Sequence, residues 1–231
     1  MKISKRQKEN LKKIDAEKSY TINEAISTLK QTANAKFNES IDIAMKLGVD
    51  PRQADQLVRG TVTLPHGTGK TVKVLVIAKP EKQEEARQAG ADYVGFEDYL
   101  KQLQTGWADC DVIIAAPDVM SELGKLGKIL GPKGLMPNPK SGTVTNDLAK
   151  AVKEVKAGRI EFRVDKAGIV HAAIGKASFE PKQLEDNVHT FINQILKMKP
   201  QTAKGIYVRS ITLTSSMGPG LSISKNELAA H

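Results

Sequence analysis

Apolar and polar residues alternate over several stretches in the outer parts of the chain, and this pattern predicts strands with one buried and one exposed face. From Ile41 to Val49 every second residue is apolar, and comparable strands are expected over 160–164, 169–174 and 206–214. Successive side chains of a strand point to opposite faces of a sheet, so alternation buries only one face. A shorter strand is expected over 61–64.

Helices with one apolar face are expected beside these strands. Thr21 and Glu24 have the spacing of a capping box, and the apolar residues that follow recur at helical spacing. A second helix has its apolar stripe at Leu184, Val188, Phe191, Ile192, Ile195 and Leu196. The basic residues 1–18 can form a further helix with a thin apolar stripe, or serve as an arm along a phosphate backbone.

The middle of the chain has a different pattern, because its main strands are apolar on both faces. Residues 71–78 and 111–115 are nearly continuously apolar, as in strands that are covered on both sides. Strands that alternate with helices are typical of a parallel α/β sheet. The other elements expected here are a short strand over 93–96 and helices over 81–88, 98–104, 120–126 and 148–155.

These patterns predict a mixed α/β and α+β protein of two domains. A discontinuous α+β outer domain, residues 1–67 plus 159–231, would carry an inserted Rossmann-like, three-layer α/β domain, residues 68–158. Gly67 and Gly158 stand at the two crossings. We expect them to act as a hinge, because glycine tolerates large backbone rotations.

The charge of the chain favours a polyanionic partner. Lys and Arg number 35 against 26 acidic residues, which gives a formal charge of +9 and a pI near 9.5. Clustered cations bind nucleic acid because they neutralise phosphates and release counterions. Cys110 is the one cysteine, so a disulfide framework is excluded. No apolar run has the length of a membrane span or the place of a signal peptide, and we expect a cytoplasmic protein without a membrane partner.

The sequence predicts no catalytic residue, no cofactor and no metal site. Residues 67–70 are similar to part of a phosphate loop, but the first glycine of that motif would fall at Leu64, and a strand follows the lysine. No glycine-rich dinucleotide loop follows the strand over 71–78. We find none of the four histidines paired with another histidine or a carboxylate at a metal-ligand spacing on one helix.

Residues 124–142, the second basic loop, are rich in Gly, Pro and Lys. Gly and Pro hold a backbone open, so that amide and ammonium groups can converge on phosphates. No carboxylate lies between Glu122 and Asp147. A phosphate-binding loop and an ordinary surface loop are both consistent with this composition. The candidate contacts are Lys125, Lys128, Lys133 and Lys140.

Two further segments, 36–40 and 215–219, flank predicted strands of the outer domain. If those strands are neighbours, the two segments share one edge of the sheet. Phe37 and Met217 could then pack on a ribose or an exposed base. Lys36 and the hydroxyls of Ser40 and Ser216 could contact phosphate or 2′-OH groups. The alternative is a buried Phe37 and a simple turn.

Residues 127–140, Gly-Lys-Ile-Leu-Gly-Pro-Lys-Gly-Leu-Met-Pro-Asn-Pro-Lys, resemble the signature of the universal L-one family of bacterial large-subunit ribosomal proteins. The resemblance covers nearly the whole chain; only the N-terminal arm and the last dozen residues are loosely patterned. Further segments similar in order and spacing are 35–37, 50–52, 58–61, 64–67, 89–92, 156–159, 175–179 and 217–219.

The resemblance implies a structural component of the 50S subunit that binds large-subunit rRNA at the mobile stalk. It also implies help in the release of exit-site tRNA, and translational repression through the mRNA of its own operon. In that family the rim of the outer domain holds the RNA, and Ser216 stands where the family commonly has Thr, which keeps the hydroxyl. Here the rim maps onto Lys36, Phe37, Lys166, Ser210, Ser216, Met217 and Gly218.

Two other functions remain as alternatives. An enzyme could use Lys70 and the inserted domain on a nucleotide, or the chain could be a basic protein without a defined partner. Binding of a nucleotide would support the first alternative, and equal binding of any RNA would support the second.

Overall fold

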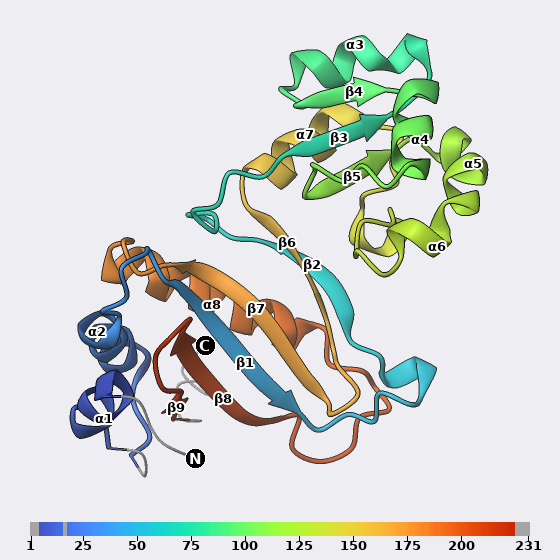
Figure 1. Cartoon of the computed structure of the whole chain (residues 1–231). Helices are drawn as coiled ribbons and strands as arrows, with labels where there is room; N and C mark the ends of the chain where they lie inside the picture. The colour runs from blue at the N-terminus through green and yellow to red at the C-terminus, as the bar shows by residue number, and fades with distance from the viewer. Residues whose placement is uncertain (1–4, 16–17, 225–231) are drawn as a thin grey trace. The chain divides into compact units, whose positions relative to one another are not determined.

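The computed structural model describes residues 5–15 and 18–224, which fall into two compact units (Figure 1). Unit 1 comprises Met1–Gly69 and Ile160–His231, and unit 2 comprises Lys70–Arg159. The first division, after Gly69, therefore lies two residues after the boundary expected from the sequence, and the second, after Arg159, lies one residue after it. A Cβ at Gly69 would lie 2.8 Å from a ring carbon of Phe179, so this glycine packs within unit 1.

Unit 1 is built on a four-stranded antiparallel sheet. Its order is β7 (Ile169–Lys176), β1 (Ser40–Leu47), β8 (Val208–Ser215) and β9 (Leu221–Ile223). The predicted strands are thus confirmed near their expected positions, and β9 is an addition. Helices α2 (Ile22–Thr32) and α8 (Pro181–Lys197) contact the sheet and each other. The predicted capping box of α2 is present, with Glu24 N–H donating to the Thr21 hydroxyl.

The two faces of this sheet differ in the way that the alternation predicts. Ile41, Ile43, Met45 and Leu47 are each at most 2% exposed and belong to the core with α2 and α8. The other face, which we call the open face, is polar and solvent-accessible. It presents Ser40, Asp42, Ala44 and Lys46 of β1 and Ser210, Thr212 and Thr214 of β8.

The remaining elements of unit 1 are short. They are α1 (Lys5–Lys12), the 3-10 turn η1 (Ala54–Gln56), and a two-stranded sheet of β2 (Arg59–Thr63) and β6 (Arg159–Arg163), whose first residue belongs to unit 2. The ring of Phe162 packs edge-on against Phe191 of α8, with centroids 5.5 Å apart. This contact joins β6 to the core of unit 1. Parts of the predicted N-terminal arm, residues 1–4 and 16–17, lie outside the described residues.

Unit 2 has the parallel α/β sheet that the sequence predicts. Its strand order is β4 (Tyr93–Gly95), β3 (Val74–Ile77) and β5 (Val112–Ala115). The crossovers through α3 (Pro80–Gln88) and α4 (Glu97–Gln104) run in opposite directions across the sheet, and right-handed crossovers then place these helices on opposite faces. The other elements are η2 (Pro117–Val119), α5 (Met120–Lys125), α6 (Gly127–Leu130), η3 (Pro139–Ser141) and α7 (Leu148–Lys156).

The glycine-rich segment before unit 2 lacks the geometry of a phosphate loop. No helix follows Lys70; the next element is β3, and Lys70 Nζ lies 2.5 Å from Oδ1 of Asp111. At the end of β3, Pro80 begins α3 directly, without a glycine-rich turn. Both observations agree with the sequence-based rejection of a nucleotide site.

Gly67 and Gly158, the predicted hinge residues, both have positive φ angles of 64° and 102°. Glycine adopts this left-handed conformation without the strain that a Cβ would cause. The turn at Gly67 is held by buried Asn187 of α8, whose amide donates to the carbonyl oxygens of Gly67 (3.0 Å) and Ile174 (2.7 Å). A hinge role for the two glycines stays a prediction.

Within the described part of the chain, no helix is long and apolar enough to cross a membrane.

Candidate nucleic-acid interface

The two flat or flexible apolar side chains predicted to meet RNA are both in solvent. Phe37 is 56% exposed and Met217 is 47% exposed, although a solvent-exposed phenyl ring loses the free energy that burial would give. The alternative of a buried Phe37 is therefore excluded. Two other large hydrophobic residues of the described chain are exposed, Leu11 and Ile206.

The segments that carry these side chains lie together at one end of β1. Ser216 N–H donates to the Ser40 carbonyl oxygen at 3.0 Å, and Ser40 N–H donates to the Ser216 hydroxyl, also at 3.0 Å. The serine hydroxyl at 216 is thus part of the link between β1 and β8. The sequence predicted that the two segments share an edge if their strands are neighbours, and β1 and β8 are paired.

Glu39 is the residue of this interface that the sequence analysis missed. It is 2% exposed, and its two carboxylate oxygens accept from Ala35 N–H (2.9 Å) and Met217 N–H (3.0 Å). Burial by itself raises the pKa of Glu39, but these backbone hydrogen bonds, together with Ser215 and the charge of Arg6, outweigh it, so the pKa is lowered overall. One buried carboxylate therefore fixes the loop of Phe37 and the loop of Met217.

Gly218 is required by its neighbour. A Cβ at this position would lie 2.4 Å from the Oγ of Ser215, closer than side-chain atoms approach. Because Ser215 is buried at the end of β8, it cannot move aside easily. The absence of a side chain at Gly218 lets the backbone of the loop approach the sheet closely.

Cations and hydroxyls surround this edge. Lys36 is exposed beside Phe37, and Lys176 Nζ donates to the Ser40 hydroxyl at 2.7 Å. Asn38 and Ser178 form a second link, in which the Asn38 amide donates to Ser178 Oγ at 2.9 Å. The structure therefore brings together Lys36, Phe37, Ser40, Ser216, Met217 and Gly218. Together with Glu39, we call them the near end of the interface.

Lys166 and Ser210 lie elsewhere on unit 1. Lys166 stands in the turn between β6 and β7, where the Asp165 carboxylate accepts from Ala167 N–H and Ile169 N–H at 2.8 Å each. Ser210 pairs with Lys46, six residues along β1 from Ser40, which corresponds to about 20 Å. These two residues form the far end of the interface, and the open face lies between the two ends.

The open face carries one carboxylate. Burial raises the pKa of Asp42, while Lys176 and His171 oppose this rise in part. A negative charge in this position costs more than it would in water, and it also opposes an approaching phosphate. Asp42 is therefore the residue of the open face whose charge is least favourable for nucleic acid.

The second basic loop in unit 2 is helical further than predicted, since a helix was expected only as far as Leu126 and the rest of the loop was expected to be open. Residues 124–130 lie in α5, α6 and the residue between them, because Leu123, Leu126 and Leu130 are buried in the core of unit 2. Open turns begin only at Gly131. All four lysines are exposed; Lys133 Nζ donates to the Gly106 carbonyl oxygen at 2.9 Å, and none has a carboxylate within ion-pair distance among the described residues.

The histidines require one correction. His189 does face a carboxylate one helical turn away, since its Nε2 lies 3.9 Å from Glu185 on α8, and His66 pairs with Asp186 at 3.0 Å. Over residues 5–15 and 18–224, no group of three possible ligands surrounds a metal position. Burial raises the pKa of the Cys110 thiol to about 11, which keeps it protonated and unreactive at neutral pH.

Comparison with known proteins shows the family to which the chain belongs. Residues 29–219 match the model of the Ribosomal protein L1p/L10e family. The chain is similar to three proteins that are each named Large ribosomal subunit protein uL1. That of Flavobacterium johnsoniae is 59% identical over 96% of this chain and 97% of its own.

The other two relatives also match over nearly the whole of both chains. The protein of Chlorobaculum tepidum is 58% identical over 94% of both chains, and that of Porphyromonas gingivalis is 55% identical over 96% of both. The match thus includes both parts of unit 1 and all of unit 2. The chain belongs to the Ribosomal protein L1p/L10e family, which is a family of ribosomal proteins and not of enzymes.

Proposed function

We propose that this protein is a structural component of the large ribosomal subunit in the bacterial cytoplasm, where it binds large-subunit rRNA at the mobile stalk. Its relatives are named as proteins of the large ribosomal subunit. The charge of +9 agrees with a polyphosphate partner. Unit 1, with its near end, open face and far end, is the proposed RNA-binding domain.

One observation carries this proposal. Phe37 and Met217 are both solvent-exposed, and they come from loops 180 residues apart that the Glu39 carboxylate holds side by side. Exposed apolar side chains that are fixed in this way cost free energy and do not serve the core. They do serve a ligand that stacks on them, as unpaired bases and riboses stack on aromatic and apolar side chains.

The remaining residues of the interface have complementary roles. Lys36 and Lys166 would neutralise phosphates at the near and far ends, which supplies affinity without sequence preference. The hydroxyls of Ser40, Ser216 and Ser210 would bond to phosphate or 2′-OH groups, and the 2′-OH distinguishes RNA from DNA. Gly218 lets an RNA strand approach the backbone. The result is recognition of a folded RNA surface by shape.

Further roles rest on the family resemblance. We infer that the protein assists the release of exit-site tRNA, and that it represses translation of its own operon mRNA by placing that mRNA on the same interface. Lys125, Lys128, Lys133 and Lys140 of the second basic loop would provide a second RNA contact from unit 2. Gly67 and Gly158 would let the two units, as separate domains, turn about the crossings.

Alanine substitution of Phe37 or Met217 tests the rRNA-binding interface. Each change is expected to weaken binding of a stalk fragment of large-subunit rRNA by about 1–3 kcal/mol, because one stacking partner is lost. Filter binding would measure this, with a scrambled RNA of equal length beside it, whose weak binding should not change.

Gln104→Ala is the control, since Gln104 is an exposed residue at the end of α4 in unit 2, outside both the interface and the second basic loop. It is expected to bind like the parent protein. Equal losses on both RNAs in the Phe37→Ala and Met217→Ala proteins, or no loss at all, would contradict the assignment of the interface.

A further inference from the structure

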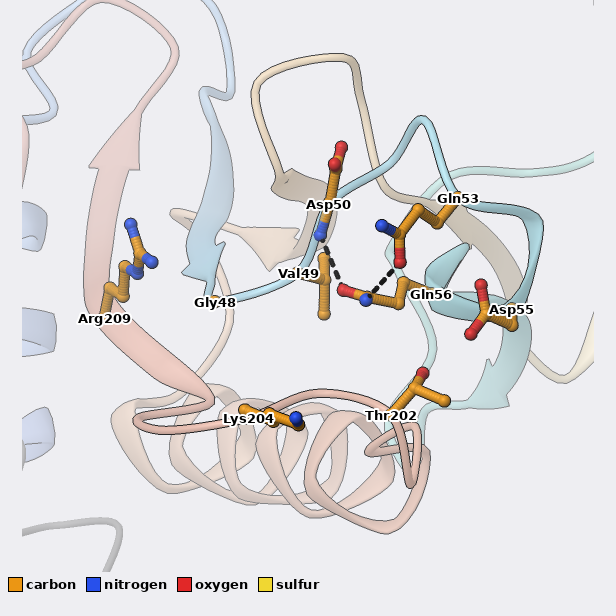
Figure 2. A pocket seen from close by; sticks show the side chains of 9 residues that line it. All are labelled: Gly48, Val49, Asp50, Gln53, Asp55, Gln56, Thr202, Lys204 and Arg209. Atoms are coloured by element: carbon orange, nitrogen blue, oxygen red, sulfur yellow. Dashed lines mark hydrogen bonds between the residues drawn. The ribbon is translucent and has the colours of Figure 1, made fainter.

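A polar pocket of about 510 Å³ lies where the open face ends, beside the far end of the interface (Figure 2). It is formed by the residues after β1, by η1 and its preceding turn, and by the loop that leads into β8. This volume is within the range of small-molecule sites, about 300–1,000 Å³. All of its lining residues belong to unit 1.

Cations without carboxylate partners line one side of the pocket. Over the described residues, neither Arg209 nor Lys204 has a carboxylate within ion-pair distance. Gly48 makes room for this arrangement. A Cβ there would lie 2.2 Å from the Ile206 carbonyl oxygen and 3.5 Å from Arg209 Nε. The missing side chain therefore lets the loop before β8 come close and leaves space at the guanidinium.

Gln53, Asp55 and Gln56 line the other side of the pocket with hydrogen-bond acceptors and a donor. Gln56 accepts from Asp50 N–H at 2.9 Å and donates to Gln53 Oε1 at 2.7 Å, so both ends of its amide are used. The hydrogen bond from Gln56 fixes the side chain of Gln53, and Nε2 of Gln53 stays available as a donor. Asp55 makes no hydrogen bond or ion pair with the described residues. Figure 2 shows Asp55 and Arg209 on opposite sides, with Val49 between them.

Guanine is the base whose edges fit a carboxylate opposite a guanidinium. Its N1–H and N2–H2 groups are adjacent donors that a carboxylate can accept together, and its O6 and N7 atoms are adjacent acceptors that Arg binds in a bidentate manner. Adenine, cytosine and uracil do not combine two adjacent donors on one edge with two adjacent acceptors on another. Lys204 is then available for the phosphate.

Continuity with the open face favours RNA as the source of this guanine. Arg209 directly precedes Ser210 on β8, and Ser210 pairs with Lys46 of β1. A strand of RNA on the open face would therefore reach the mouth of the pocket. Proteins read RNA chiefly by splaying out unpaired bases and bonding to their edges.

We propose that this pocket holds one unstacked guanine nucleotide of the bound RNA, with Asp55 on the Watson–Crick edge, Arg209 on O6 and N7, and Lys204 on a phosphate. The proposal rests on the proposed RNA-binding function. It assigns Asp55 and Arg209 a role in the choice of base and Lys204 a role in phosphate binding, at a place separate from the stacking residues of the near end.

The first test uses mononucleotides and the full chain. Guanosine, adenosine, cytidine and uridine 5′-monophosphates and inorganic phosphate are titrated, and binding is followed by NMR chemical shifts. The guanosine compound is expected to bind about tenfold more tightly than the other three. Asp55→Asn and Arg209→Gln should remove this preference, whereas Lys204→Gln should weaken all five probes.

Matched controls are Asp118→Asn and Lys182→Gln, which change exposed residues outside the pocket and should leave every affinity unchanged. Equal binding of the four nucleotides by the parent protein, or an unchanged guanine preference in Asp55→Asn, would overturn the proposal.

The second test uses the stalk rRNA fragment with single guanosines replaced by inosine, which lacks the N2 amino group. One replacement is expected to weaken binding by the parent protein about tenfold and to have no effect on Asp55→Asn. If every replacement acts equally on both proteins, the pocket is not an RNA subsite. Sensitivity to Phe37→Ala would still support the proposed function in that case. If the fragment does not bind at all, the proposed function fails, and with it the assignment to RNA.

Discussion

Among single residues, Glu39 has the largest expected effect on the near end, because its buried carboxylate accepts hydrogen bonds from both loops. Glu39→Gln keeps the size of the side chain but replaces one acceptor oxygen by an amide that donates. The N–H of Ala35 or Met217 then loses its acceptor, at a cost of about 1–3 kcal/mol. Specific RNA binding should fall as in Met217→Ala, and filter binding together with urea unfolding would measure both effects. Glu122→Gln, an exposed change in unit 2, is the control.

The pH dependence of this contribution follows from the lowered pKa of Glu39. A carboxyl group whose pKa is lower in the folded than in the unfolded protein stabilises the fold at any pH above its unfolded pKa, near 4.5. This stabilisation is lost as the pH falls through the lowered pKa of the folded protein. The near end should therefore persist in mild acid and open only below that value. A pH series that showed loss of the Glu39 contribution near neutrality would contradict this assignment.

Asp42 should affect RNA binding in the opposite direction. Burial raises its pKa, so its charge is removed at a higher pH than that of an ordinary aspartate, near 3.8. At neutral pH Asp42→Asn should bind RNA more tightly by about 1 kcal/mol, since one unfavourable charge on the open face is gone. As pH falls through the raised pKa, the parent protein should reach the affinity of the variant.

Filter binding of both proteins over a pH series measures this convergence. A difference that is independent of pH would mean that the Asp42 charge does not act on the RNA.

The sequence predicted the exposed residues of the near end better than the buried one. Phe37 and Met217 were singled out as apolar residues with basic or polar neighbours beside predicted strands, with a buried Phe37 as the alternative, and both are exposed. Glu39 is a charged residue directly before β1, and a charged residue is ordinarily expected in solvent. Its burial depends on two N–H groups that come from loops far apart in sequence, so no local pattern shows it.

Among the elements, long periodic segments and even the short strand β4 were predicted near their observed positions, whereas β9 and α6 were not. Over β1 and α8 the alternation and the helical stripe continue long enough to identify the element. The three residues of β9 are too few for a period and exist as a strand because β8 offers an edge. Gly127 and Gly131 suggested an open loop, but the leucines between 123 and 130 hold α5 and α6 against the core.

Asn187 is the polar link between three elements of unit 1, namely α8, β7 and the turn after β2. It also accepts from His66 N–H at 3.2 Å, so its replacement by Ala would leave three buried or half-buried backbone groups unpaired. We expect a loss of about 1–3 kcal/mol in the free energy of unfolding, measured with urea by circular dichroism.

Gln194→Ala on the same helix is the control for this change, because its bond to Thr61 is long, at 3.4 Å. Trp107, the one tryptophan of the chain, reports on unit 2 alone. If the units are separate domains, its fluorescence transition should not move with Asn187→Ala. A joint shift of both transitions would mean that the units unfold together.

For the whole molecule, the charge of +9 predicts a strong dependence of RNA affinity on salt. If about five phosphates are neutralised, the logarithm of the binding constant should fall with the logarithm of salt concentration at a slope of about −4. Replacing Lys125, Lys128, Lys133 and Lys140 by Gln should reduce this slope by about one for each lysine that contacts a phosphate. Filter binding of the stalk fragment at several salt concentrations gives the slopes.

Four exposed lysines of unit 2 outside the second basic loop provide a variant of equal charge. Gln at Lys79, Lys101, Lys150 and Lys153 removes the same net charge. Long-range attraction depends on net charge and would fall equally in both variants, whereas counterion release depends on direct phosphate contacts. A reduced slope in the loop variant alone would therefore place RNA on the second basic loop. Equal slopes in the two variants would confine the RNA contacts to unit 1, and the loop would then be an ordinary surface segment.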